Sequence, residues 1–380
     1  MTRNQPRYHF GVDGFTLTEG PWASSVNHYV EQILMHLRPQ DREARFTCYT
    51  RPSPYPLAPI LSKAPVDWNE PMGSNFTWRH VALPLAARRS RVDALWFPFH
   101  TIPLLIGTPS AITIHDISFV RLPHRFNWQT KLYLGTLLRR ALAQASQILT
   151  ISQFTADELI RVFSVPANRI TIIYHGFSER LTRPNPSVAD ALLEKLGLRR
   201  PYFLFLDGAN SRKNIGLLIE LLRKAPKHRL SDFQFIITGN PLKMLRILQA
   251  SGLGGQIGTQ ILLPGILPEQ ELDILYRRAR ALLYLSEYEG FGLPILEAFA
   301  RQCPVIALRA SSLPEVAGEG ALFIEPGSTS QLEDALQSVM SENTRRQLIA
   351  LGEKEGHRFS WQSGADRLCQ TLVKVAHEKK

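Results

Sequence analysis

Short runs of apolar, often β-branched residues alternate along the chain with longer stretches in which apolar residues recur at helical spacing. Helical patterns include QTKLYLGTLLRRALAQA, QFTADELIRVF and PILEAFARQ. The short runs indicate buried strands at 94–99, 110–116, 147–152, 169–176, 202–208, 233–239, 259–265, 281–286, 304–308 and 321–325. This alternation predicts an α/β fold of parallel sheets with helices on both faces.

The alternation restarts part-way along the chain. SERLTRPNPSVADALL (178–193) contains two prolines, and LGLRRP (196–201) leads into a new strand at Tyr202. We therefore predict two doubly wound, Rossmann-like domains joined by a linker near 177–200. The predicted division is an N-terminal domain 1–180, a C-terminal domain 200–357 and an amphipathic C-terminal helix 358–380.

Composition narrows the class of protein. The 380 residues are 44% hydrophobic, which is enough for two cores. No run of about 18 apolar residues predicts a transmembrane helix, and the N-terminus lacks the apolar core of a signal peptide, so we expect a cytoplasmic protein. The three cysteines are scattered, which argues against disulfides or a zinc site.

The formal charge of +11 is concentrated toward the N-terminus. Up to Asp190 there are 20 Lys and Arg against 13 Asp and Glu, and beyond it 24 against 20. A basic surface attracts phosphate-bearing ligands, anionic lipid or nucleic acid, although a solvated surface gives the same count. Because no nucleic-acid-binding motif accompanies the charge, we expect no nucleic acid partner and favour docking on an anionic membrane surface.

The stretch SEYEGFGLPILEAFA (286–300) carries the most chemistry. It follows a predicted strand, and Pro294 marks the start of a helix. Ligands of parallel sheets bind at the carboxyl ends of strands, and a helix N-terminus favours phosphate. Gly290 and Gly292 would let the backbone approach that phosphate. Glu297 in the first helical turn could bind a ribose diol, and Glu289 could meet the group beyond the phosphates.

Two further loops add polar groups at strand ends. Arg212 and Lys213 follow the strand YFLFLDG, where adjacent cations suit a diphosphate. In the N-terminal half, His115 and Asp116 end the strand of TIHDISF. This pair could serve as an acid, a base or a hydrogen-bond anchor for a hydroxylated substrate. Gly20 precedes a helix and would allow a ligand to approach its N-terminus.

Each of these features also has an ordinary structural explanation. In that explanation Glu297 complements the helix dipole, and Glu289 is a solvated loop residue. His115 then only caps a strand end. Cations at a helix N-terminus oppose the dipole unless an anion is bound, which weakens the structural explanation for Arg212 and Lys213.

Taken in order, these segments resemble the family 4 retaining glycosyltransferases of the GT-B fold. The matching pieces span nearly the whole chain: TIHDISF, ILTISQFTADEL, ITIIYHGF, the RKN loop, SEYEGFGLPILEAFARQCPVIA, LPEVAGEGALFIEP and HRFSWQSGADRL. The resemblance implies two Rossmann-like domains facing across a cleft, with the last helix crossing back to the N-terminal domain. It also implies a nucleotide-sugar donor in the C-terminal domain and a glycan or lipid-diphosphate-linked acceptor in the other.

The resemblance assigns roles residue by residue. Arg212 and Lys213 match the diphosphate-neutralising pair, Glu297 the ribose-binding glutamate and Glu289 the donor-sugar contact. The remaining predicted donor-binding residues are Gly20, Gly208, Asn210, Ile266 near the base, Gly290, and the loop residues Phe291, Gly292 and Leu293. Two departures are clear: Ala209 stands where many relatives have arginine, and TEGPWASS stands where many have a Gly-Gly pair.

The implied chemistry is hexosyl transfer with retention of configuration, in cell-surface or extracellular polysaccharide biosynthesis. No Asp-x-Asp motif is present, so we predict catalysis that requires no metal and no other cofactor. UDP-glucose is the favoured donor, with GDP-mannose as the alternative. A GT-B epimerase and a non-catalytic sugar-nucleotide-binding protein remain as rivals, distinguished by product analysis with donor alone and by a donor-hydrolysis assay.

Overall fold

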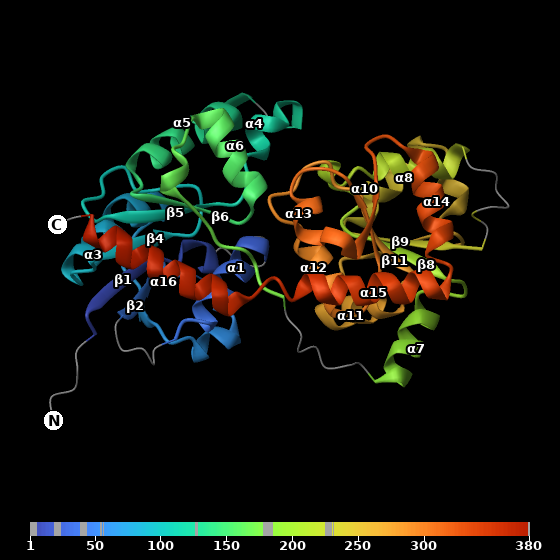
Figure 1. Cartoon of the computed structure of the whole chain (residues 1–380), viewed down its shortest axis with the longest axis horizontal. Helices are drawn as coiled ribbons and strands as arrows, with labels where there is room; N and C mark the ends of the chain where they lie inside the picture. The colour runs from blue at the N-terminus through green and yellow to red at the C-terminus, as the bar shows by residue number, and fades with distance from the viewer. Residues whose placement is uncertain are drawn as a thin grey trace. The chain divides into compact units, whose positions relative to one another are not determined.

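The computed structural model describes residues 6–18, 24–38, 44–53, 55, 57–125, 128–177, 185–224, 230 and 232–378. Contacts between residues divide the chain into two compact units (Figure 1). Unit 1 comprises Met1–Gly176 and Ser360–Lys380, and unit 2 comprises Phe177–Phe359. Each unit is an α/β body with its own parallel sheet, which confirms the predicted fold class.

Unit 1 is built on a sheet in the order β3-β2-β1-β4-β5-β6-β7, and all of its strand pairs are parallel. The strands are β1 Tyr8–Asp13, β2 Ala44–Tyr49, β3 Asp67–Asn69, β4 Ala94–Phe97, β5 Ser110–Ile114, β6 Gln147–Thr150 and β7 Ile170–Ile172. The central strands are buried along their whole length because helices cover both faces. The strand order reverses between β1 and β4, where such sheets bind ligands at the carboxyl edge.

The helices of unit 1 include the last helix of the chain, α16 (Trp361–His377), which packs against α1, β4 and β5. Gly176 makes room for this helix, because a Cβ there would lie 2.2 Å from the Trp361 ring. The other helical segments are η1 Phe15–Thr18, α1 Ser24–Met35, η4 Pro59–Lys63, α2 Asn75–Thr77, η5 Trp78–Ala82, α3 Leu83–Arg89, α4 Ser118–Arg121, η6 Pro123–Arg125, α5 Trp128–Gln144, α6 Gln153–Phe163 and η7 Ala167–Arg169.

Unit 2 has a sheet in the order β10-β9-β8-β11-β12-β13, again parallel throughout. Its strands are β8 Tyr202–Phe205, β9 Gln234–Thr238, β10 Ile261–Gly265, β11 Ala281–Tyr284, β12 Val305–Leu308 and β13 Ala321–Ile324. All their carboxyl ends therefore lie at one edge, and the order reverses between β8 and β11. The loops that follow these two strands carry the predicted cations and carboxylates.

Capping residues set where several helices of unit 2 begin. Asn240, Ser328 and Ser341 each accept a hydrogen bond from a backbone N–H of the first turn of the helix that follows. The helical segments are α7 Pro186–Lys195, η8 Ser211–Lys213, α8 Ile215–Lys224, α10 Pro241–Ala250, η9 Gly254–Gln256, α11 Glu269–Arg278, α12 Leu293–Ala300, α13 Leu313–Ala317, η10 Gly318–Gly320, α14 Thr329–Ser338 and α15 Glu342–Gly356.

Candidate active site

The predicted cation and carboxylate of unit 2 meet at the carboxyl edge of its sheet. The Lys213 Nζ donates to Glu289 Oε1 at 2.7 Å and to the Tyr284 hydroxyl at 3.2 Å. The Lys213 side chain is only 14% exposed and the Glu289 side chain only 13%. Two charges removed from water in this way stabilise each other, and removing either would leave the other uncompensated. Lys213 also lies 4.6 Å from the centre of the Tyr284 ring, a cation–π contact.

The loop between β11 and α12 is fixed from both sides. The Glu287 N–H donates to the carbonyl of Arg212 at 3.1 Å, which ties this loop to the cation loop after β8. The Ser312 hydroxyl donates to the carbonyls of Glu289 at 2.9 Å and Phe291 at 2.8 Å, and the Ser311 hydroxyl accepts from the Glu289 N–H at 3.0 Å. The sequence reasoning missed both serines, although the pair directly precedes the α13 motif LPEVA.

Gly292 allows α12 to start where it does. Its φ of 105° is strained for any residue with a side chain, and an added Cβ would lie 3.0 Å from a Leu313 methyl group. Pro294 stands at the beginning of the helix, as predicted. Gly290 is buried, Leu293 is half-buried, and the Phe291 ring packs edge-on against Phe359 with centroids 5.5 Å apart. The Phe291 side chain thus belongs to the core, which leaves its backbone to approach a ligand.

Glu297 is held by a residue that the sequence reasoning did not select. The hydroxyl of Tyr276, on α11, donates to Glu297 Oε2 at 2.8 Å. Burial, together with the charge of Glu297, raises the pKa of the Tyr276 hydroxyl well above its ordinary value, so the hydroxyl keeps its proton. Arg301 donates to the Glu297 carbonyl at 3.2 Å. The glutamate is therefore orientated before any ligand arrives.

The loop after β8 is shaped by its own residues. Asn210 Oδ1 accepts from the Arg212 N–H at 3.2 Å, and Asn210 Nδ2 donates to Asp207 Oδ2 at 3.1 Å. Gly208 permits close packing, because a Cβ would lie 2.4 Å from an Ile237 methyl group. The two residues thus have clear structural roles in the loop, and their predicted donor contacts stay predictions.

Ile266 directly follows β10 at the same sheet edge, and 80% of it is exposed. An apolar side chain held in water at the ligand-binding edge suits a stacking or packing contact with a planar group. Its assignment to the base is a prediction that this exposure favours. Gly20, the remaining predicted donor-site residue, lies outside the described residues.

In unit 1, His115 and Asp116 follow β5 at its carboxyl end. The His115 Nε2–H donates to the Pro98 carbonyl at 2.7 Å, and Asp116 Oδ1 accepts from the Ser118 N–H at 2.8 Å. Burial lowers the pKa of His115, so the ring is neutral at pH 7 and Nδ1 is its acceptor nitrogen. That tautomer suits accepting a hydrogen bond from a hydroxyl group.

An aromatic cluster stands behind His115. The Tyr29 ring packs against His115 at 5.2 Å, His175 at 5.0 Å and Trp361 at 6.3 Å between centroids. Burial lowers the pKa of His175 well below its ordinary value. His175 falls within the predicted strand 169–176 but received no predicted role, and Tyr29 and Trp361 were not among the predicted site residues.

Among the residues that the structure describes, no three His, Cys, Asp or Glu side chains are grouped so that they could hold a metal ion. No described helix is both long and apolar enough to cross a membrane.

Two doubly wound parallel sheets are the architecture of the GT-B fold, which solved structures share with this chain. At the carboxyl edge of the second sheet, a cation–carboxylate pair lies beside a helix N-terminus. The chain belongs to glycosyltransferase family 4: residues 26–180 match the model described as Glycosyltransferase Family 4, and residues 191–355 match Glycosyl transferases group 1. The resemblance predicted from the sequence is confirmed.

Curated relatives include O-antigen mannosyltransferases. The chain is 32% identical to O-antigen chain mannosyltransferase B of Escherichia coli over 253 residues, 66% of each chain. It is 28% identical to O-antigen chain mannosyltransferase RfbU of Salmonella typhimurium over 240 residues, 63% of each chain. The matched stretches thus span just under two thirds of these relatives.

Solved structures share the fold over almost the full length. Anabaena Alr3699/HepE in complex with UDP-glucose superposes with a TM-score of 0.72 at 18% identity, covering 97% of this chain and 100% of that one. WaaG, a glycosyltransferase involved in lipopolysaccharide biosynthesis, gives a TM-score of 0.69 at 14% identity, covering 96% and 99%.

Proposed function

We propose that this chain is a retaining hexosyltransferase that moves a sugar from a nucleoside diphosphate donor to a glycan or lipid-diphosphate-linked acceptor. The observation that carries the proposal is the buried Lys213–Glu289 pair beside the N-terminus of α12. Lys213 and the helix N–H groups would meet the diphosphate, Glu289 the donor sugar and Glu297 the ribose.

In this proposal the chemical step needs only charge stabilisation. The bond from C1 of the sugar to the diphosphate oxygen breaks, and its electron pair stays on the diphosphate. The acceptor hydroxyl attacks C1 from the same face, and its proton passes to the departing phosphate oxygen. Lys213, Arg212 and the α12 N–H groups stabilise the charge that builds on the diphosphate, and no metal is required.

The names of the curated relatives favour GDP-mannose over UDP-glucose as the donor. The sequence alone favoured UDP-glucose, whereas the relatives' names favour mannose, and so GDP-mannose is the proposed donor. The route would be the synthesis of a cell-surface polysaccharide.

The test supplies GDP-mannose and UDP-glucose separately, each with and without a mannose-terminated acceptor, and follows nucleoside diphosphate release. Acceptor-dependent release from GDP-mannose, an α-linked product by NMR and unchanged turnover in EDTA are expected. Turnover with UDP-glucose but not with GDP-mannose would reject the proposed donor. Activity that is lost in EDTA and restored by magnesium would reject metal independence. Conversion of the donor without acceptor would instead identify an epimerase.

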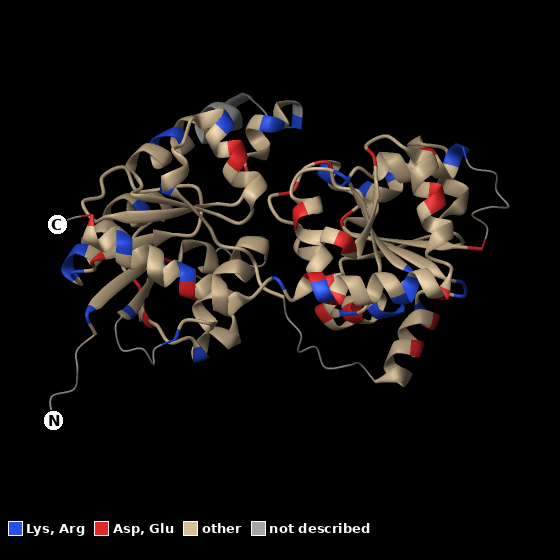
Figure 2. Ribbon diagram, in the orientation of Figure 1, with Lys and Arg blue, Asp and Glu red and all other residues tan. Residues whose placement is uncertain are grey.

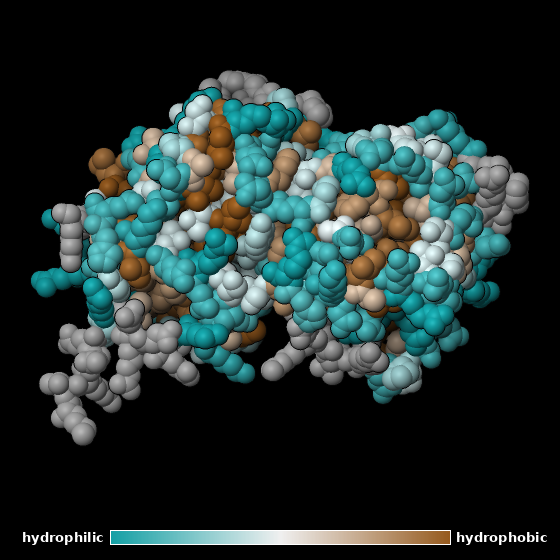
Figure 3. Space-filling model, in the orientation of Figure 1, coloured by the Kyte–Doolittle hydropathy of each residue, from teal (hydrophilic) through white to brown (hydrophobic). Residues whose placement is uncertain are grey.

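A surface of unit 1 supports the proposal of a peripheral enzyme on an anionic, cytoplasmic membrane face. Val81, Leu85 and Leu105 are all about half exposed or more, and they line a groove of about 740 Å³ together with Arg88 and Arg91. Figure 2 shows Lys and Arg gathered at the end of α3, and Figure 3 shows apolar residues among hydrophilic ones on the viewed face. Arginines beside exposed apolar side chains suit a lipid interface.

Vesicle co-sedimentation tests this surface. The variant V81S/L85S/L105S should lose most binding to vesicles that contain anionic lipid, while L242S, which changes an exposed leucine of unit 2, should bind normally. Equal binding by both variants, or binding that ignores the anionic lipid content, would reject the membrane surface.

A further inference from the structure

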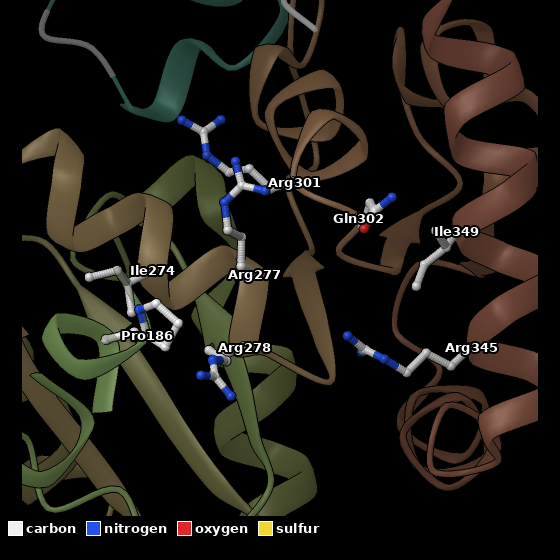
Figure 4. A pocket seen from close by; sticks show the side chains of 9 residues that line it. Pro186, Ile274, Arg277, Arg278, Arg301, Gln302, Arg345 and Ile349 are labelled. Atoms are coloured by element: carbon white, nitrogen blue, oxygen red, sulfur yellow. The ribbon is translucent and has the colours of Figure 1, made fainter. Parts of the chain in front are cut away.

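Unit 2 contains a second pocket, of about 320 Å³, that the proposed chemistry does not use (Figure 4). Four arginines line it: Arg277 and Arg278 at the end of α11, Arg301 just after α12, and Arg345 on α15. Ile274 and Ile349 supply an apolar wall. A pocket of this size lies within the range of small-molecule sites.

The pocket lies at the opposite sheet edge from Lys213 and Glu289. Arg277 and Arg278 directly precede β11, and Arg301 precedes β12, so they stand at the amino ends of these strands. Lys213 and Glu289 follow the carboxyl ends of β8 and β11. The pocket therefore lies away from the Lys213–Glu289 pair, although Arg301 also donates to the Glu297 carbonyl at 3.2 Å.

The pocket is lined by more arginines than the carboxylates that pair with them. Asp273 pairs with both Arg277 and Arg301, each through Nε at 2.8 Å. Arg278 pairs at 3.2 Å with Asp190, a carboxylate whose side chain is 68% exposed and so interacts weakly.

Arg345 differs from the other three arginines. Its Nη1 donates to the carbonyls of Ala279 and Arg280 at 2.9 and 2.8 Å, which are neutral acceptors. Burial lowers the pKa of the Arg345 guanidinium, and the charge of Arg280 adds to that shift while the charge of Glu342 opposes it. In Figure 4 this side chain extends from α15 toward the space that Arg278 and Gln302 border.

We propose that this pocket binds a small phosphoryl anion, free or carried on a compact organic group. Guanidinium groups bind phosphate oxygens through two parallel hydrogen bonds, and four arginines line this pocket. The isoleucine wall would contact the organic part. The inference does not rest on the proposed transferase function, because the hydrogen bonds of Arg278 and Arg345 are to Asp190 and to the carbonyls of Ala279 and Arg280, not to predicted donor-site residues.

Isothermal titration with inorganic phosphate and, separately, with a hexose 1-phosphate tests the site. The titrations use the wild type and Lys213→Met, so that anion binding at the donor edge is distinguished. Binding should persist in Lys213→Met and weaken about tenfold in Arg278→Gln, the scale of one charge-assisted hydrogen bond. Tighter binding of the hexose phosphate would identify an organic ligand, and equal binding would identify free phosphate.

Arg346→Gln is the matched control. Arg346 neighbours Arg345 on α15 but is exposed and outside the pocket, and it donates to the Glu342 carbonyl. Its replacement removes the same charge and should leave the affinity unchanged. Arg278 is half exposed, so Arg278→Gln should fold normally, which a thermal melt verifies. An equal loss in both variants, no loss in Arg278→Gln, or no binding of either anion would overturn the proposal.

Discussion

Tyr276 shows how a residue outside the predicted set controls one inside it. Its buried hydroxyl holds the Glu297 carboxylate at 2.8 Å, and the Arg301 guanidinium lies 5.1 Å from the centre of its ring. Sequence reasoning found Glu297 from its position in the first turn of a helix. It could not find Tyr276, because the contact joins α11 to α12 across an intervening strand and no local pattern marks it.

The variant Tyr276→Phe tests this positioning role. Removing the hydroxyl should raise the donor KM roughly tenfold, the scale of one hydrogen bond to a charged group, with a smaller change in kcat. Tyr202→Phe is the matched control, since that buried hydroxyl donates to the Leu275 carbonyl and does not contact Glu297. An equal rise in KM in both variants would indicate a general effect on unit 2 and contradict the role.

Several histidines whose pKa is lowered in the folded chain, among them His100, His115 and His175, make the stability of unit 1 sensitive to acid. Burial lowers the pKa of His100 to about 4, and lowers the pKa of His115 and of His175 below their ordinary value of 6.5. The unfolded chain therefore binds protons first as the pH falls. The stability from neutral rings is complete above pH 6.5 and is lost as the pH drops from there toward 4.

Each such histidine should contribute a slope of about 1.4 kcal/mol per pH unit below its unfolded pKa. Thermal melts between about pH 7.5 and 5 should show Tm falling on acidification, and His175→Gln should flatten that fall. A slope in His175→Gln as steep as in the wild type would show that this ring does not carry the effect.

At the scale of elements, the strands rich in β-branched residues were predicted well, and β1, β2 and β3 were not among them. β1 reads YHFGVD, with a histidine and a glycine that weaken a strand pattern. Its His9 is nonetheless buried, because its ring bonds the Thr47 hydroxyl at 2.8 Å and the Ser90 carbonyl at 3.0 Å. Partners this far away in the sequence are supplied by the fold, so local pattern cannot reveal them.

The loop between β11 and α12 depends on one backbone conformation. Gly292→Ala forces a side chain into φ near 105° and against Leu313, which should lower the stability of unit 2 by about 1–3 kcal/mol. Gly255→Ala is the control, because nothing lies within 4 Å of a Cβ at that position. Chemical denaturation measures both, and an equal effect of the two substitutions would contradict the strain assigned to Gly292.

At the scale of the whole molecule, the restart of the pattern near Tyr202 indicated two Rossmann-like bodies, and the structure has two parallel sheets. The last helix returns to unit 1, where its Trp361 fills the space that Gly176 leaves. Order and spacing of strands can be read from sequence because burial on both faces demands apolar runs. The close pairing of Lys213 with Glu289 cannot be read from the sequence, since it depends on β8 lying beside β11.

The proposed transfer depends most on Lys213, which would stabilise the charge on the departing diphosphate. Steady-state kinetics of Lys213→Met with the preferred donor measure this directly, and Lys243→Met, at an exposed position on α10, is the control. We expect kcat/KM to fall about 10²-fold in Lys213→Met and to stay near wild type in Lys243→Met. Turnover by correctly folded Lys213→Met at the wild-type rate would contradict it.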